Sequence, residues 1–355
     1  MKSKKSILTR RKFFKNTGIA AFGLSLGTNK SWGVPAYIPN LLKPNSKING
    51  IQIGVITYSF WGMEDQSAEA TLQYILDCGI NAIELMGNVA ENYLRKPQYE
   101  IDRRTLNRLM RLDRKKEISR DEKKQLADLK QQQKSYEKAA ANWKKNRDPN
   151  DLFKLRKMFN DAGVEIYAFK PDDLLGSKNS DADITYAMKA GKVLGASHVT
   201  LELPGPPYGP KDPEHTLRLG KLAEKNDIKV AYHGHTQQHA NWWDTALKQS
   251  ESNVMNPDLG HYIAAGNTDV FEFLSKMNKK IYSLHIKDRT TPANGQDYTP
   301  FGMGDTPIVD VLQLMRDQKY SFPATVEYEY KTPKNSTIIN EIKKCVDYCK
   351  DALES

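Results

Sequence analysis

Charged and imidazole side chains recur in this chain at one kind of position, the end of a short apolar run. The run 198–203 contains Glu202 near its end, and the run 281–286 contains His285 and is followed by Lys287. Carboxylate oxygens and imidazole nitrogens together form mixed sites that suit Mn²⁺, Zn²⁺, Co²⁺ or Mg²⁺. The run-end residues of this kind are Glu84, Lys170, Glu202, His233, His235, Asp258, His261, His285, Lys287, Glu327 and Glu329.

The apolar runs alternate with helical patterns along most of the chain. Ser67 is a suitable N-cap for a helix that ends at Gly79, and similar helical segments separate the later runs. Eight strands alternating with helices are typical of parallel βα units, and an eightfold barrel needs about 250 residues. We therefore expect an α/β fold, a (β/α)8 TIM barrel. The expected strands lie at 51–58, 81–86, 164–169, 198–203, 228–232, 252–256, 281–286 and 324–328.

A barrel of this kind would bring the run-end residues together, because its active site lies at the carboxyl ends of the strands. One Glu or His at a strand end is ordinarily a solvated loop residue. Many of them converging from most of the strands indicate a site. A doubly wound open sheet is the alternative fold, but it calls for a Gly-rich phosphate loop after the first strand, and residues 57–62 do not form one.

A basic segment, residues 95–148, interrupts the pattern after the second expected strand. It holds 18 Lys and Arg against nine Asp and Glu, with few large apolar residues. This composition predicts a charged helical insertion, a solvated hairpin with many opposite-charge pairs. A basic face that holds an anionic polymer, or a neighbouring subunit of a homo-oligomer, stays open as an alternative. The expected domains are a leader at 1–33, a linker at 34–50, and a barrel at 51–355 that contains this insertion.

The leader indicates export from the cytoplasm. Residues 1–33 carry eight Lys and Arg and no Asp or Glu, and the pair Arg10-Arg11 precedes a short, weakly apolar stretch at 17–27. This arrangement resembles a twin-arginine signal peptide, and the stretch is too short to span a membrane. We therefore expect the twin-arginine translocase as a partner during export, and a periplasmic protein. A basic tail that binds an acidic partner is the alternative.

Composition excludes several classes of protein. The formal net charge of +10 comes from the leader and the basic segment, so the rest of the chain is acidic. With 39% hydrophobic and 27% charged residues the chain is no multi-span membrane protein, and we expect no membrane span in the mature chain. Three cysteines do not make a disulfide framework. The basic segment holds few aromatic residues able to stack on bases, so we expect no nucleic-acid partner.

Four short motifs, in order along the chain, carry a resemblance to a known family. Over about residues 51–350, apart from the basic segment, the chain resembles the xylose-isomerase-like barrel superfamily. That group includes sugar phosphate isomerases and epimerases, ketose 3-epimerases, inosose dehydratases and apurinic endonucleases. The motifs are Leu201-Glu202-Leu203-Pro204, Asp258-Leu259-Gly260-His261-Tyr262, Leu284-His285-Ile286-Lys287-Asp288 and Val326-Glu327-Tyr328-Glu329.

The resemblance implies a site with one divalent metal ion. Its ligands would be Glu202, Asp258, His285 and Glu327. Such an ion acidifies a carbon-bound hydrogen of a sugar or keto-sugar by stabilising the enediolate. Glu202 and Glu327, on opposite sides of the barrel, would be the catalytic acid–base pair that removes and returns the proton. The implied activity is that of a metal-dependent sugar isomerase or epimerase, with a small-molecule sugar as its partner.

Further side chains around this set are expected to bind the sugar. Imidazoles and cationic groups would hold its oxygens, and an exposed indole ring would pack on its apolar face. The candidates are His233, His235, His261, Lys287, Arg289, Lys170 and Trp61.

Three other functions compete with this interpretation. A metal-dependent lyase, either a dehydratase or a hydratase, would use the same enediolate on a keto-sugar or an inosose-like substrate. An apurinic endonuclease would need extra histidines at the ends of strands two and three, where the chain has Glu84 and Lys170 instead. A non-catalytic carbohydrate-binding barrel is the third alternative.

Overall fold

Eight parallel strands form a ring in the part of the chain that the computed structural model describes, residues 43–171, 174–202 and 211–355. They pair in the order β7-β6-β5-β4-β3-β2-β11-β8, and parallel bridges Met255–Ile281 and Asp258–His285 link the two ends of that order. The TIM barrel expected from the sequence is therefore confirmed. The strands are β2 (Ile51–Ile56), β3 (Ala82–Met86), β4 (Glu165–Lys170), β5 (His198–Glu202), β6 (Lys229–His233), β7 (Asn253–Asn256), β8 (Leu284–Ile286) and β11 (Ala324–Val326).

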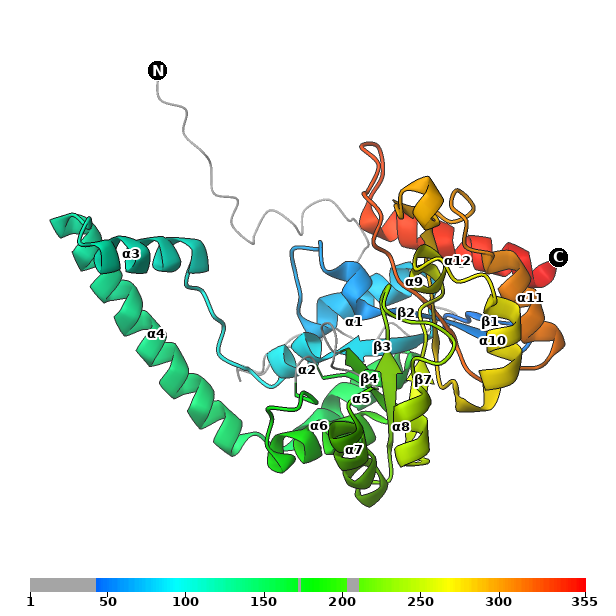
Figure 1. The fold of residues 1–355 in the computed structure, drawn as a ribbon, viewed down its shortest axis with the longest axis horizontal. Helices are drawn as coiled ribbons and strands as arrows, with labels where there is room; N and C mark the ends of the chain where they lie inside the picture. The colour runs from blue at the N-terminus through cyan, green and yellow to red at the C-terminus, as the bar shows by residue number, and fades with distance from the viewer. Residues whose placement is uncertain (1–42, 172–173, 203–210) are drawn as a thin grey trace, which may run out of the picture. The chain divides into compact units, whose positions relative to one another are not determined.

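Helices follow the strands and surround them (Figure 1). Two short pairings lie outside the ring: β1 (Lys47–Ile48) runs antiparallel to β2, and β9 (Asp288–Arg289) pairs with β10 (Tyr298–Thr299). In the described ranges, no helix is long and apolar enough to cross a membrane. The helices are α1 (Ala68–Asp77), α2 (Gly87–Tyr93), α3 (Arg103–Lys115), α4 (Arg120–Asn146), α5 (Phe153–Asp161), α6 (Asp181–Leu194), α7 (Pro213–Lys225), α8 (Asp244–Gln249), α9 (Leu259–Ala264), α10 (Val270–Met277), α11 (Ile308–Asp317) and α12 (Ile338–Glu354).

Local sequence signals set the ends of several barrel helices. The Ser67 side chain accepts a hydrogen bond from the Ala70 amide and so begins α1, as its position predicts. Gly195 caps α6 with a φ of +89°, a left-handed conformation that glycine adopts without steric cost. The expected leader at 1–33, with its Arg10-Arg11 pair, and most of the linker at 34–50 lie outside the described residues.

The basic segment forms a two-helix hairpin, α3 and α4, that has an apolar seam of its own. Ile101, Leu106, Leu109 and Leu126 are buried in this seam, separately from the barrel core. Ser119 begins α4 with a capping box, in which its side chain and that of Glu122 bond to each other's backbone amides. The structure thus shows helices where the sequence predicts a charged helical insertion, and the seam holds them together.

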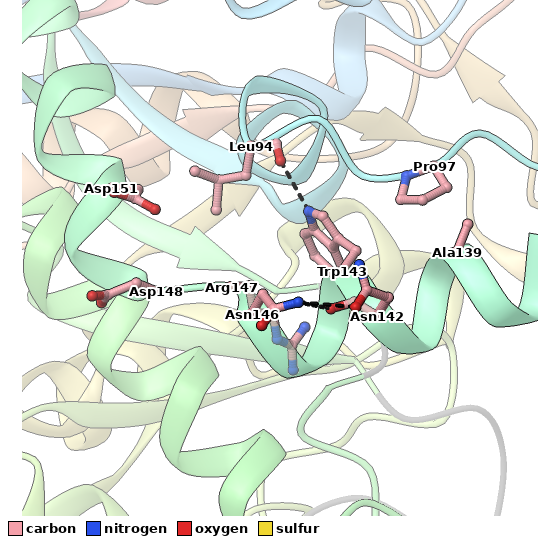
Figure 2. Close-up of a pocket in the computed structure, with 9 residues that line it drawn as sticks. All are labelled: Leu94, Pro97, Ala139, Asn142, Trp143, Asn146, Arg147, Asp148 and Asp151. Carbon is pink, nitrogen blue, oxygen red and sulfur yellow. Dashed lines mark hydrogen bonds between the residues drawn. The ribbon is translucent and has the colours of Figure 1, made fainter.

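The last turns of α4 attach the hairpin to the barrel. The Trp143 indole donates a hydrogen bond to the Leu94 carbonyl oxygen at 2.9 Å, and the Lys144 ammonium donates to Asp183 on α6 at 2.8 Å. Arg147 lies over the Tyr186 ring at 3.7 Å and its guanidinium reaches Asp183 at 3.1 Å. A pocket of about 430 Å³ lies at this junction (Figure 2), lined by Leu94, Pro97, Ala139, Asn142, Trp143, Asn146, Arg147, Asp148 and Asp151.

Arg147 is the buried member of this attachment, and its replacement should destabilise the protein. Its side chain is 5% exposed and neutralises Asp183 and Glu91, so Arg147→Met leaves buried carboxylates short of a partner. The expected loss in the free energy of unfolding is about 3 kcal/mol. Arg108→Met is the matched control, because Arg108 pairs with Glu122 on the exposed hairpin surface and should cost less than about 1 kcal/mol. Equal losses in urea denaturation would contradict this assignment of the attachment.

Candidate metal centre

Four buried side chains meet at the carboxyl ends of the barrel strands. His233 ends β6, Asp258 follows β7, His285 lies in β8 and Glu327 follows β11. Their ligand atoms all lie within 4.8 Å of one another, and each residue is 6% exposed or less. The strand ends therefore converge as the barrel requires, and they bring three of the four expected metal ligands, Asp258, His285 and Glu327, into one group with His233.

His285 lies between two carboxylates. Its Nδ1 is 2.7 Å from Glu327 Oε2, and its Nε2 is 2.7 Å from Glu84 Oε2. Burial would lower the pKa of His285, but the charges of Glu84 and Glu327 raise it to about 10. Burial would likewise raise the pKa of Glu84, but the His285 charge lowers it to about 2. The centre of the group therefore favours a positive charge.

His233, unlike His285, is a neutral imidazole. Its Nδ1 lies 2.6 Å from Asn256 Oδ1, whereas its Nε2 is buried and has no hydrogen-bond partner among the described residues. Burial and the nearby charges of His285 and Lys170 lower the pKa of His233 to about 3, so the ring is neutral. A neutral imidazole with one unpartnered buried nitrogen is the form that binds metal ions.

The donor set fits a divalent metal ion. Asp258 Oδ2 is also buried without a hydrogen bond in the described structure, although the Lys287 ammonium lies 3.2 Å away. Two imidazoles and two carboxylates suit Zn²⁺, Mn²⁺ or Co²⁺, and a more oxygen-rich set would be expected for Mg²⁺. Asp258, His285 and Glu327, the expected ligands that this group contains, are thus residues that would hold the ion.

Glu202 lies beside this group rather than within it. It forms a second group with His233 and His235, and its Oε1 is 3.1 Å from His235 Nε2. The Lys170 ammonium donates a hydrogen bond to the other carboxylate oxygen. Burial alone would raise the pKa of Glu202, but the His235 hydrogen bond and the Lys170 charge lower it, so the carboxylate is ionised. Its side chain is 36% exposed, against 6% for Glu327.

Two cationic side chains, Lys287 and Arg289, lie next to Asp258 at the edge of the group of buried donors. The Lys287 ammonium lies 2.9 Å from Glu327 Oε2 and also bonds to Glu329. His261 Nε2 is 3.2 Å from Lys287 Nζ, and Arg289 Nη1 is 2.6 Å from His261 Nδ1. The expected substrate-binding residues His261, Lys287 and Arg289 are therefore one connected set.

The Asp258–His261 motif has a structural explanation as well. Asp258 Oδ1 accepts a hydrogen bond from the His261 amide at 2.7 Å and so begins α9. Gly260 is required between them, because a Cβ there would lie 2.4 Å from the Lys287 side chain. The spacing that the sequence shows as Asp-x-x-His thus places the carboxylate and the imidazole on one helical turn.

Aromatic side chains are exposed near the same strand ends. Tyr58 and Trp61 stack with ring centroids 6.3 Å apart, and Trp61 is 64% exposed. Tyr298 lies under the Arg289 guanidinium at 4.1 Å. Burial and the charges of Glu329 and Glu327 raise the pKa of Tyr58. These rings are suited to pack on a sugar.

Sequence reasoning gave no role to two residues of this centre. Glu84 was evident as a strand-end carboxylate, and only the structure shows that it contacts His285 from across the ring. Asn256 at the end of β7 carries no charge and gave no signal beyond its position at the end of an expected strand.

The chain is similar to known proteins in sequence family and in fold. Residues 132–349 match the family model described as "Xylose isomerase-like TIM barrel". No curated protein matches the chain.

Solved structures with this fold include enzymes of more than one kind. A probable 3-DHS dehydratase, AsbF, from Bacillus anthracis shares 14% identity over 84% of this chain and 98% of its own, with a TM-score of 0.56. An L-ribulose 3-epimerase shares 12% identity over 86% and 95%, with a TM-score of 0.52. The IolI protein with a bound zinc atom shares 15% identity over 86% and 98%, with a TM-score of 0.56. At these identities the likeness is one of fold.

Proposed function

We propose a function for this chain, which belongs to the xylose isomerase-like TIM barrel family. It is a divalent-metal-dependent enzyme that isomerises or epimerises a sugar or keto-sugar. One observation carries the proposal. An ionised, part-exposed Glu202 adjoins a buried group of donors that fits a metal ion. Glu202 ends β5 and Glu327 follows β11, four strands apart in a ring of eight, so the two carboxylates approach from opposite sides.

The proposal gives each side chain a separate task. A divalent ion held by Asp258, His285 and Glu327 would polarise the carbonyl of a bound ketose and acidify the hydrogen on the adjacent carbon. Glu202 would take that proton at a carboxylate oxygen, with Lys170 and His235 holding its other contacts. Glu327, which is ionised in the metal-free protein, would receive a proton from solvent by way of the Lys287 ammonium at 2.9 Å and deliver it to the opposite face, which inverts the carbon.

The polar and aromatic side chains around the metal-binding group would bind and orient the sugar. Lys287 and Arg289 can donate hydrogen bonds to its hydroxyl oxygens, with His261 between them to orient their side chains, and the part-exposed His235 can also bind a hydroxyl. Trp61 and Tyr298, both exposed, would cover an apolar ring face and reduce access of water.

A metal-dependent lyase is the second candidate. It is favoured by the Lys170 ammonium beside Glu202, which could protonate a departing hydroxyl, and by the neighbouring His235 imidazole, which could hydrogen-bond to it. The dehydratase among the solved structures with this fold is consistent with that possibility for this chain.

Incubation with ketoses in deuterated water tests the two candidates together. Protein loaded separately with Mn²⁺, Co²⁺, Zn²⁺ or Mg²⁺ should transfer deuterium from solvent to the carbon next to the carbonyl and form the epimer or isomer, as NMR would show. Glu202→Gln should lower this exchange by about 10² to 10⁴-fold. A conjugated-enone absorbance without an epimer would identify the lyase, and sugar binding without exchange or elimination would refute both.

A further inference from the structure

A line of buried hydrogen bonds runs from His233 through the barrel interior. His233 Nδ1 lies 2.6 Å from Asn256 Oδ1, and Asn256 Nδ2 lies 2.5 Å from Ser283 Oγ. Ser283 Oγ is in turn 2.9 Å from His198 Nε2. All four residues are 1% exposed or less, so water does not compete for these bonds.

The last hydrogen bond of this line fixes which atoms along it donate and which accept. His198 Nδ1 lies 2.9 Å from Ser197 Oγ, and the Ser197 hydroxyl reaches the Tyr167 carbonyl oxygen at 3.1 Å. A carbonyl oxygen can only accept, so Ser197 donates to it and accepts from His198. Ser283 then donates to His198 Nε2, and the reverse direction would lose the bond to Tyr167, about 1 kcal/mol.

This pattern of donors and acceptors determines which ring nitrogen of His233 carries the proton. Because Ser283 donates to His198, its oxygen accepts from the Asn256 amide nitrogen, and the Asn256 amide oxygen faces His233. His233 therefore carries its proton on Nδ1 and donates it to Asn256. The other ring nitrogen, Nε2, keeps its lone pair, and it is the buried atom without a hydrogen-bond partner that faces Asp258, His285 and Glu327.

We infer that His233, through Nε2, is the fourth protein ligand of the metal ion, in the position that the family resemblance gives to Glu202. The inference rests on the proposed function, since it concerns the same ion. Hydrogen bonds from outer residues commonly fix the tautomer of a ligating histidine, and Asn256, Ser283 and His198 would act here as positioning residues. Glu202, which bonds to Lys170 and His235, would then transfer protons without also having to serve as a metal ligand.

The tautomer can be measured in the metal-free wild-type protein. Proton–nitrogen correlation spectra of histidine labelled with nitrogen-15 distinguish a protonated from an unprotonated ring nitrogen, and His233→Gln assigns the signal. We expect His233 to be neutral with its proton on Nδ1. A proton on Nε2 would overturn the inference without any assay of activity.

Titration with Zn²⁺ and Co²⁺, followed by calorimetry, tests the ligand set. His233→Gln and Asn256→Leu should weaken metal binding by about 10- to 100-fold, whereas the dissociation constant of Glu202→Gln should match that of the wild type. Asn256→Asp keeps an acceptor for the Nδ1 proton and should bind metal more tightly than Asn256→Leu. Ser283→Ala, which removes a single hydroxyl, should show the same trend with less risk to folding.

The outcomes separate this inference from the function on which it rests. If Glu202→Gln loses the metal while His233→Gln keeps it, the ligand is Glu202 and only the inference is wrong. If the wild-type protein binds none of the divalent ions tested, the proposed metal-dependent function fails as well.

Discussion

Glu327→Gln is expected to lower turnover by about 10² to 10⁴-fold, the usual contribution of a positioned acid–base group. The wild-type carboxylate contacts His285 at 2.7 Å and Lys287 at 2.9 Å, and burial has not neutralised it: the two cations hold the pKa of Glu327 well below its usual range. The amide keeps the size and one oxygen ligand but cannot accept a proton. Metal affinity should fall as well, and solvent deuterium should no longer enter the substrate from this face.

Glu329→Gln is the matched control for that prediction. Glu329 also bonds to Lys287, but its side chain is 21% exposed and it belongs to neither group of metal-binding donors found among the described residues. Turnover and bound metal should change much less than in Glu327→Gln. If Glu329→Gln were inactive and Glu327→Gln behaved as wild type, the roles assigned after β11 would be interchanged.

The barrel could be predicted from the sequence because each of its units carries its own signals. The run 51–58 contains β2, and the run 198–203 contains β5, since both are apolar stretches bounded by helix caps or turn residues. Even β7, only four residues long, lies inside its expected run. A strand or helix depends mainly on neighbours in sequence, so periodicity and capping residues are sufficient to locate it.

The site could be predicted only in part, because its contacts join residues far apart in sequence. Strand-end position placed Asp258, His285 and Glu327 among eleven candidates, and the family resemblance selected them as metal ligands. It could not show that Glu84 bonds to His285, 201 residues away, nor that Asn256 holds His233. The difference between a ligand and a neighbour is a matter of a few ångströms and of ring tautomer, and both depend on how opposite strands of the barrel face each other.

Glu202 and His233 show the same dependence on contacts between residues that are distant in sequence. Both stand at the carboxyl ends of adjacent strands, β5 and β6, and the family resemblance favours Glu202 as the metal ligand. The structure adds that Glu202 is occupied by Lys170 and His235, whereas His233 Nε2 is unpartnered in the described residues. Hydrogen-bond satisfaction, which sequence does not reveal, distinguishes the two.

Lys287→Met is expected to lower the free energy of unfolding of the metal-free protein by about 3 to 5 kcal/mol, because it removes one partner of a buried ion-pair network. The Lys287 side chain is 3% exposed and neutralises three carboxylates, with Asp258 at 3.2 Å, Glu327 at 2.9 Å and Glu329 bonded directly. Burial alone would lower the pKa of Lys287, yet these charges raise it well above its usual value. The carboxylates left behind would repel one another.

A divalent ion should restore part of this loss, because it supplies positive charge to the same carboxylates. Urea denaturation with EDTA and with saturating Mn²⁺ should show that the metal stabilises Lys287→Met more than it stabilises the wild type. Lys192→Met is the control, since Lys192 pairs with Asp227 on the surface and its loss should cost less than about 1 kcal/mol with or without metal. If the metal stabilised Lys287→Met and Lys192→Met equally, Lys287 would not share its carboxylates with the ion, and the centre would have to lie away from Asp258 and Glu327.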